Sequence, residues 1–130
     1  MTQKIANIAL LVNDYDEAIE FYTQRLGFTL IEDTKMSETK RWVIVSPPGA
    51  TESRLLLAKA KNEAQQMRVG DQAGQRVFLF LHTDDFWRDY NKMKENGVKI
   101  VREASEEVYG TVAVFEDLYG NLWDLVEPKK

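Results

Sequence analysis

The sequence predicts an α+β fold that consists of two tandem βαβββ repeats. Three observations support this prediction. Two segments keep the same order of apolar and polar signals, each begins with an apolar strand-like run, and each contains an amphipathic helix that ends at a glycine. The repeats cover residues 4–60 and 76–128, and residues 61–75 connect them. Because single hydrophobic cores commonly form at about 100 to 150 residues, we expect the 130 residues to make one domain.

Each repeat begins with a strand that is followed by a helix cap. The apolar runs are residues 8–12 and 77–81, and both have the length of a strand. Asp14 and Asp85 come soon after them, and an aspartate at this place can accept hydrogen bonds from the free N–H groups at a helix start. In the first repeat, Glu17 completes a pair with the cap that resembles a capping box.

The two predicted helices each carry one apolar face and end at a glycine. Gly27 and Gly97 mark these ends, where a residue with positive φ is favoured. The apolar residues follow helical spacing and are Tyr15, Ala18, Ile19, Tyr22 and Leu26 in the first helix, and Phe86, Tyr90 and Met93 in the second.

Three more strand-like runs follow each helix. The turns Pro47-Pro48-Gly49 and Tyr119-Gly120-Asn121 separate the last two runs of each repeat. The runs are residues 28–32, 42–46 and 54–58 in the first repeat, and residues 98–102, 111–116 and 122–126 in the second. The order of elements is therefore the same in both repeats.

The connector is polar and contains Gly70 and Gly74. Residues 63–68 within it are predicted to form a helical turn. A connecting segment of this length is either an excursion over the surface or a lid, and the surface excursion is the simpler interpretation. The two glycines are not followed by the lysine and serine of a phosphate-binding loop, so the sequence gives no support for nucleotide binding.

Composition and charge exclude several classes of function. The chain has 44% apolar and 29% charged residues, which is typical of globular proteins, and its apolar runs are far shorter than the roughly 20 residues of a membrane span. It has no cysteine and its first residues lack a signal-peptide core, so we expect a cytoplasmic protein without a membrane partner. A formal charge of −4 without a large basic cluster indicates no nucleic-acid partner.

Both ends of the chain carry a resemblance to a known family. At the N-terminal end it lies in Asn7-Ile8-Ala9-Leu10-Leu11-Val12-Asn13-Asp14, in Ala18-Ile19-Glu20-Phe21-Tyr22 and in Leu26-Gly27-Phe28. At the C-terminal end it lies in Phe115-Glu116-Asp117-Leu118-Tyr119-Gly120-Asn121-Leu122-Trp123-Asp124-Leu125. The combination resembles the vicinal oxygen chelate superfamily, which contains glyoxalases, bleomycin resistance proteins and dioxygenases.

This resemblance implies a fold, a site and an assembly. Each βαβββ unit would form half of an incompletely closed, eight-stranded barrel-like sheet. The cleft between the units would hold a small organic ligand, and in many members a metal. Since the two halves often come from different chains, the resemblance also implies a homodimer.

The residues at the metal-ligand positions of the family are poor ligands here. By the resemblance, these positions fall on Asn7, Leu56, Phe78 and Asp124. Catalytic zinc sites commonly use three protein ligands, and leucine and phenylalanine supply none. We therefore expect no cofactor. The alternative is a metal-dependent lyase of the glyoxalase type, or a dioxygenase, with a divalent metal on Asp124, His82 and Glu116.

Several other residues are candidates for the ligand site. His82 is the only histidine, and it either lies at the rim of the cleft or is a strand-end residue bonded to Thr83 or Asp84. Of the three tryptophans, Trp42 is the best candidate for a ligand contact. Trp123 alternates with Asp124 along the strand and is expected to face either the helix layer or an interface.

The sequence therefore predicts a protein that binds a small molecule in an apolar and aromatic cleft, and it does not decide whether the protein is also an enzyme. A non-catalytic module that binds a protein partner is the third interpretation, suggested by the connector. The predicted ligand-binding residues are Asn7, Leu11, Trp42, Leu56, Phe78, Phe80, His82, Tyr109 and Asp124.

Overall fold

The structure is a computed structural model that describes residues 1–130. The chain divides into two compact units, Met1–Val69 and Gly70–Lys130. The first unit contains β1 (Asn7–Val12), α1 (Tyr15–Glu20), the π-helix η1 (Phe21–Arg25), β2 (Thr29–Lys35), β3 (Arg41–Ser46), β4 (Arg54–Lys59) and α2 (Glu63–Gln66). The second contains β5 (Val77–His82), α3 (Phe86–Glu95), β6 (Ile100–Glu107), β7 (Gly110–Glu116) and β8 (Leu122–Pro128).

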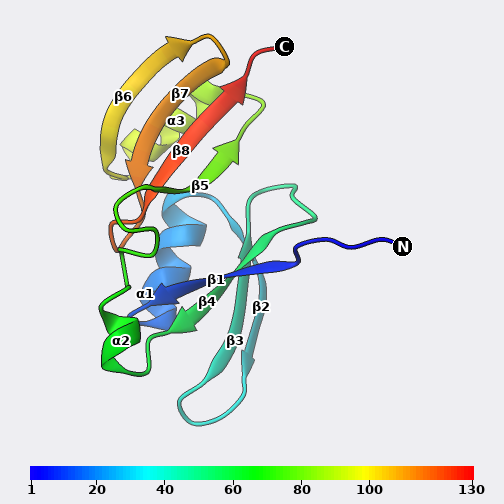
Figure 1. Ribbon diagram of the computed structural model, residues 1–130, viewed down its shortest axis with the longest axis vertical. Helices are drawn as coiled ribbons and strands as arrows, with labels where there is room; N and C mark the ends of the chain where they lie inside the picture. The colour runs from blue at the N-terminus through cyan, green and yellow to red at the C-terminus, as the bar shows by residue number, and fades with distance from the viewer. The chain divides into compact units, whose positions relative to one another are not determined.

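Each unit contains one four-stranded mixed sheet, and the two sheets have the same topology (Figure 1). The strand orders are β1-β4-β3-β2 and β5-β8-β7-β6. In each sheet the first strand is parallel to the last, and the remaining pairs are antiparallel. The repeated βαβββ order and the α+β class predicted from the sequence are therefore confirmed, as two open sheets and not as a closed barrel.

The core of the first unit lies between its sheet and α1. Alternation along the strands sends one set of apolar side chains toward the helix, where Ala18 and Tyr22 are fully buried. Phe21 and Phe28 pack against the Tyr22 ring, with centroid separations of 5.4 and 5.5 Å. The buried strand residues are Leu10, Val12, Val43, Val45, Leu55 and Leu57.

The first helix starts as predicted but continues differently. The Asp14 carboxylate accepts a hydrogen bond from the backbone N–H of Glu17 at 2.9 Å, which confirms the predicted cap. After Glu20, however, the chain forms a π-helix, in which the backbone N–H of Leu26 donates to the carbonyl of Phe21 at 3.2 Å. The wider turn allows Phe21 and Tyr22, which are neighbours in the sequence, both to be buried.

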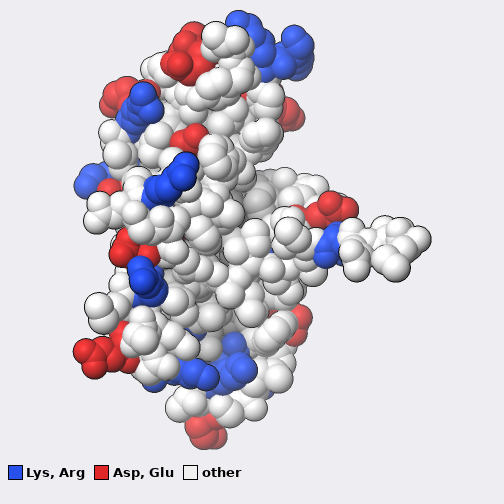
Figure 2. Space-filling model, in the orientation of Figure 1, with Lys and Arg blue, Asp and Glu red and all other residues white.

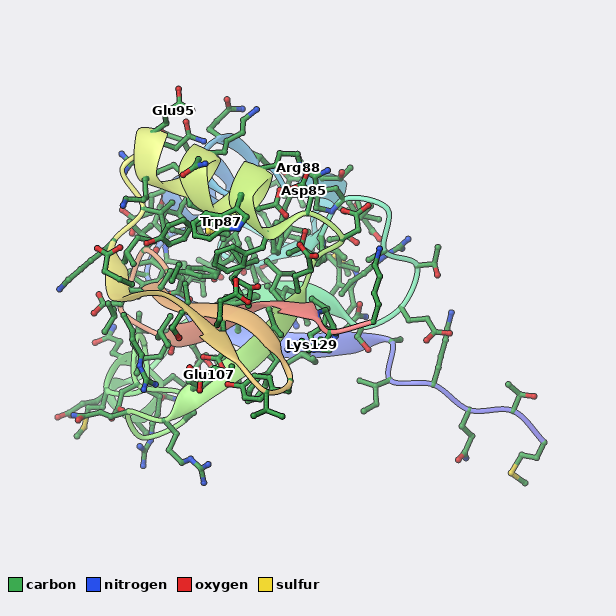
Figure 3. All side chains as sticks on the ribbon, turned by 90° about the horizontal axis from the view of Figure 1, so that it is seen from above. Asp85, Trp87, Arg88, Glu95, Glu107 and Lys129 are labelled. Carbon is green, nitrogen blue, oxygen red and sulfur yellow. The ribbon has the colours of Figure 1, made fainter.

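The core of the second unit lies between its sheet and α3. Asp85 caps this helix through the backbone N–H of Arg88 at 3.2 Å, and the predicted stripe of Phe86, Tyr90 and Met93 is buried. Figure 3 shows α3 lying along one side of the strands, with Arg88 and Glu95 on its outer side. On the strands, the Trp123 and Phe115 rings stack at 5.7 Å and are almost fully buried with Ala113 and Leu125. Trp123 thus faces the helix layer, one of the two places predicted for it.

The two units share an equivalent hydrogen bond between helix and hairpin, which supports their description as repeats. In the first, the hydroxyl of Tyr15 in α1 accepts a hydrogen bond from the backbone N–H of Arg41 at 3.2 Å. In the second, the hydroxyl of Tyr90 in α3 accepts one from the backbone N–H of Ala104 at 3.3 Å and is also bonded to Glu103. Each helix is therefore tied to its hairpin through a tyrosine hydroxyl.

The strand ends differ from the predicted ones mainly in the edge strands. Strands β2 and β6 continue to Lys35 and Glu107, whereas the sequence predicted ends at Glu32 and Arg102. Their exposed polar residues carry no apolar alternation, but hairpin pairing with β3 and β7 keeps them in the sheet. The predicted helical turn of the connector is confirmed as α2. None of the helices has the length and apolarity required to span a membrane.

Candidate functional site

The second sheet carries one continuous row of functional side chains across all four strands. The register pairs Phe80 of β5 with Asp124 of β8, and it pairs Asp124 with Val114 of β7. Val114 in turn pairs with Arg102 of β6. Because the neighbouring residues in β7 and β8 are buried on the α3 side, this row lies on the opposite side of the sheet, which we call the far face of the second sheet. The row joins an aromatic ring, a carboxylate, an apolar floor and a guanidinium.

Asp124 is the residue of this row whose carboxyl group has a shifted pKa. Burial raises the pKa of its carboxyl group above the ordinary aspartate value, and the positive charge of Arg102 lowers it in part. The partly buried carboxylate therefore has a desolvation cost that Arg102 only partly offsets. A cation placed on the carboxylate would favour its ionised form further.

Phe80 stands beside this carboxylate with 63% of its surface exposed. A large aromatic side chain that is exposed next to a half-buried charge is unusual for a surface, and such combinations occur at binding sites. The ring presents a face on which a planar or cationic group can rest.

His82 lies on the same face, two residues further along β5 than Phe80. It is exposed and pairs with Val126 of β8. Its two expected partners are engaged elsewhere, because the Thr83 hydroxyl bonds to Asp89 and the Asp84 carboxylate forms an ion pair with Arg88. His82 is therefore exposed at the end of β5 on the face that carries the row, and its place at the rim of a ligand cleft stays a prediction.

Two predicted site residues of this unit lie apart from the row. Phe78 is the extra residue of a register shift between Val77 and Leu79, so strand alternation does not assign it to either face. Tyr109 lies in the turn between β6 and β7, where its carbonyl accepts a hydrogen bond from the backbone N–H of Lys129. The row lies several residues along the strands from this turn.

In the first unit, the predicted site residues share the face of the sheet opposite α1. Asn7 and Leu11 are on β1, Trp42 is on β3 and Leu56 is on β4, and each alternates with buried residues on the helix side. The row that corresponds to the Asp124 row consists of Ala9, Leu56, Ile44 and Glu32. It has no carboxylate at the central position.

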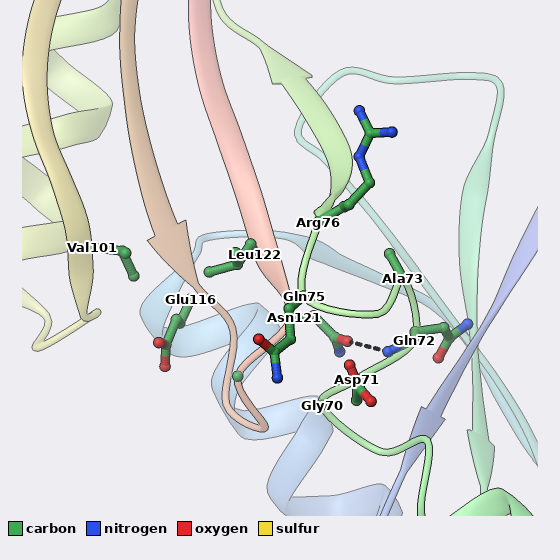
Figure 4. Close-up of a pocket in the computed structure, with 11 residues that line it drawn as sticks. Gly70, Asp71, Gln72, Ala73, Gln75, Arg76, Val101, Glu116, Asn121 and Leu122 are labelled. Carbon is green, nitrogen blue, oxygen red and sulfur yellow. Dashed lines mark hydrogen bonds between the residues drawn. The ribbon is translucent and has the colours of Figure 1, made fainter.

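A pocket of about 560 Å³ lies at one end of the second unit (Figure 4). Its apolar wall comes from Val101 and Leu122, and the Glu116 carboxylate borders it. Glu116 pairs with Leu122 in the register, so both belong to the far face, next to the Asp124 row. The remaining lining residues come from the connector and the β7–β8 turn, and are Gly70, Asp71, Gln72, Ala73, Gln75, Arg76, Gly120 and Asn121.

The connector part of this pocket is fixed to the β7–β8 turn. The side-chain oxygen of buried Asn121 accepts a hydrogen bond from the backbone N–H of Gln72 at 3.1 Å. The Asn121 amide donates to Asp117 at 2.9 Å, and the same aspartate accepts the backbone N–H groups of the turn. Gly70 packs so closely on this turn that a Cβ there would lie 1.9 Å from the carbonyl oxygen of Tyr119.

Comparison with known proteins identifies the family. A family model described as the Glyoxalase/Bleomycin resistance protein/Dioxygenase superfamily matches residues 4–125. The chain belongs to this superfamily. It is 63% identical over 128 residues to a protein of Shewanella frigidimarina (strain NCIMB 400), and the aligned part makes up 98% of this chain and 95% of that protein.

Two solved structures have the same fold as this chain. UcmS2 is similar with a TM-score of 0.85 and 28% identity, covering 98% of this chain and 99% of that chain. TnmS3, an antibiotic binding protein from Streptomyces sp. CB03234, is similar with a TM-score of 0.80 and 28% identity, covering 98% of each chain.

The residues at the superfamily's metal-ligand positions do not fit a metal ion. Leu56 and Asp124 occupy equivalent places, because Leu56 pairs with Ala9 just as Asp124 pairs with Phe80. The assignment of Phe78 as the counterpart of Asn7 needs correction. Asn7 pairs with Arg54 and Val77 with Leu122, so in the register Asn7 corresponds to Val77. Phe78 and Val77 are both apolar, so the second unit has no metal donor at this position with either assignment.

The alternative ligand set is not assembled either. The chain contains no group of three or more histidine, cysteine, aspartate or glutamate side chains that could hold a metal ion. Asp124, His82 and Glu116 therefore do not form a three-ligand cluster, although all three come from the same sheet.

Sequence reasoning missed two parts of this site. Arg102 was the last residue of a predicted strand, and nothing in its neighbours indicated that it would lie in the same row as Asp124. Residues 70–75 of the connector were predicted only to be part of a surface excursion or a lid. Their two glycines were a signal, since close backbone packing such as that of Gly70 requires a missing side chain.

Proposed function

We propose that this protein binds a small organic molecule with a positive charge and an aromatic or apolar body on the far face of the second sheet. The observation that carries the proposal is the row in which exposed Phe80 stands beside the half-buried carboxylate of Asp124. Burial of the carboxylate, and the resulting rise of its pKa, means that a bound cation would replace hydration that the fold has already partly removed.

The arrangement of the row also gives the ligand a direction. An ammonium group near Asp124 would lie beside the ring of Phe80, where a cation gains a further attraction to the aromatic face. Arg102, at the other end, repels a cation, so the apolar body of the ligand would extend over Val114. The mixture of an apolar surface with few convergent polar groups is usual for ligand sites.

Two further features agree with a binding function. The similar protein TnmS3 is an antibiotic binding protein. On the face shown in Figure 2, acidic and basic side chains are interspersed within each unit, and no broad basic patch for nucleic acid is visible there.

The proposal is tested with a matched pair of small aromatic probes. The dissociation constant of 4-methylbenzylamine, a cation, is compared with that of 4-methylbenzyl alcohol, its neutral counterpart, by NMR titration of the whole chain at pH 7. We expect the amine to bind at least about tenfold more tightly, because a partly desolvated charge pair contributes more than a surface pair. Asp124→Asn should abolish the amine preference that is reported by the resonances of Phe80 and Val114, the two neighbours of Asp124 in the row.

Glu95→Gln is the matched control, since it removes the same charge from the outer side of α3. It should change neither dissociation constant by more than about twofold. Equal affinity of the wild-type chain for the amine and the alcohol would contradict the proposal. So would an amine preference that persists at the resonances of Phe80 and Val114 in Asp124→Asn.

The homodimer implied by the superfamily is a separate proposal. The measurement is the molar mass in solution by light scattering coupled to gel filtration, and we expect twice the chain mass of 15.0 kDa. A mass equal to one chain at all concentrations would contradict it.

A further inference from the structure

The pocket beside the connector has the chemistry of a second cation site. The Glu116 carboxylate and the carbonyl oxygen of Gly70 border the same space, since a Cβ on Gly120 would lie 3.9 Å from the first and 3.8 Å from the second. Asp71 adds a second carboxylate to the lining. Figure 4 shows the side chain of Arg76 pointing away from these groups. The pocket therefore presents hydrogen-bond acceptors and negative charge above an apolar wall.

The one basic side chain that pairs with Glu116 is held weakly. The Lys99 ammonium lies 3.6 Å from the Glu116 carboxylate and is 72% exposed, whereas the Glu116 side chain is only 26% exposed. Ion pairs of exposed lysines contribute little and are easily replaced. A ligand ammonium entering from the pocket could therefore take the place of Lys99 on the carboxylate.

This pocket and the Asp124 row are continuous. Glu116 pairs with Leu122, and Asp124 is two residues further along the same strand on the same face. Diagonal neighbours of this kind have Cα atoms roughly 7 to 8 Å apart. Two carboxylates thus lie one behind the other on a common apolar surface, with Leu122 and Val114 between and beside them.

We infer that the pocket formed by Glu116, Gly70 and Asp71 receives the second positive charge of an elongated organic dication, whose first charge lies on Asp124. The inference rests on the proposed function, because it requires that the far face binds a cation. It adds a ligand class, an aromatic diamine, and it assigns a role to the connector, whose backbone closes the pocket through the bond between Gln72 and Asn121.

The test compares para-xylylenediamine with 4-methylbenzylamine, which has the same ring and lacks the second amine. NMR titrations of the whole chain at pH 7 give both dissociation constants for each variant. We expect the diamine to bind the wild-type chain about three- to tenfold more tightly than the monoamine. Glu116→Gln should lower this ratio to about two, the statistical value for a diamine whose two equivalent amines can each occupy the one remaining site.

Lys99→Met provides a second, independent measurement, because it removes the competing ammonium without touching the carboxylate. It should increase the ratio of the two affinities. Glu95→Gln again serves as the charge control and should leave the ratio unchanged.

The outcomes separate the two proposals. A ratio that stays clearly above the statistical value of about two in Glu116→Gln, or that does not exceed about two in the wild-type chain, overturns the second charge site. The far-face proposal stands in that case if Asp124→Asn still weakens binding of the monoamine. Failure of both amines to bind the wild-type chain overturns both proposals.

Discussion

The two sheets of this protein have the same topology, and they differ at the centre of the face opposite the helix. In the first sheet the central row is Ala9, Leu56, Ile44 and Glu32, and in the second it is Phe80, Asp124, Val114 and Arg102. The row of the first sheet thus has apolar residues at its centre and a carboxylate only at its edge, whereas the row of the second carries a central carboxylate, a guanidinium and an exposed ring. A duplicated scaffold can therefore hold two different surfaces, and the function has to be argued from the row and not from the fold.

The difference also has an energetic side. Leu56 makes no electrostatic demand, while Asp124 is desolvated enough to raise its pKa and has only the charge of Arg102 in partial compensation. Binding sites commonly retain such unfavourable groups, because a ligand supplies the missing partner. The following variants test this comparison, beginning with the largest expected effect.

The scaffold itself is tested by truncating the helix side of the equivalent last strands. Trp123→Ala and Leu55→Ala each remove a side chain that is 2% exposed and packed in its unit's core. We expect losses of about 3 to 5 kcal/mol for the tryptophan and about 2 to 5 kcal/mol for the leucine in the free energy of unfolding, measured with urea. A loss below about 1 kcal/mol at either position would contradict equivalent cores.

The apolar centre of the row in the first sheet is tested by Leu56→Asp, which places a carboxylate at the position equivalent to Asp124. No arginine corresponds to Arg102 there, because Glu32 pairs with Ile44 in that row. The new charge should cost about 2 to 4 kcal/mol of unfolding free energy, from lost apolar contact and desolvation. Leu56→Asn is the control without charge, and an equal loss in both variants would show that charge is not the cause.

The charged row is tested by Asp124→Leu, with a smaller and opposite effect. Because the folded carboxyl group has a raised pKa, ionisation opposes folding, and this cost is complete above the raised pKa and absent below the ordinary aspartate value. The variant should therefore be more stable than the wild-type chain at pH 7, by roughly 1 kcal/mol or less. The difference should shrink as the pH falls through the raised pKa, and a variant that is less stable at pH 7 would contradict the assignment.

The same titration gives a pH dependence of binding. Affinity for 4-methylbenzylamine should be highest where Asp124 is ionised and should fall as the pH drops through the raised pKa, above the ordinary aspartate value of about 3.9. Since the amine stays protonated throughout this range, the midpoint reports the carboxyl group. Affinity that is constant down to about pH 3 in the NMR titration would exclude Asp124 as the binding group.

Much of this fold could be predicted from local signals. The caps at Asp14 and Asp85, the glycine stops and the alternation at Trp123 depend on residues close in the sequence, and the structure confirms them. The π-helix at Phe21–Arg25 could not be predicted, because the choice of a wider turn depends on how two adjacent rings are buried in the core.

The candidate site was less predictable for the same reason. Asp124 was found through its place in a repeated motif, but its relation to Arg102 depends on the register of three strands with two shifts in β6. The register shift at Phe78 likewise has no signal in an apolar run. The pocket depends on the close approach of Gly70 to Tyr119, which are far apart in the chain.

The most direct test of the central claim is to map the contact surface of a bound aromatic cation. In the titration of the isotope-labelled chain with 4-methylbenzylamine, the largest chemical-shift changes should fall on Phe80, His82, Val114 and Asp124. The equivalent residues Ala9, Ile44 and Leu56 should change less. Changes that are confined to the row of the first sheet, or that are absent from Asp124 and Phe80 at saturation, would contradict a binding function of the second sheet.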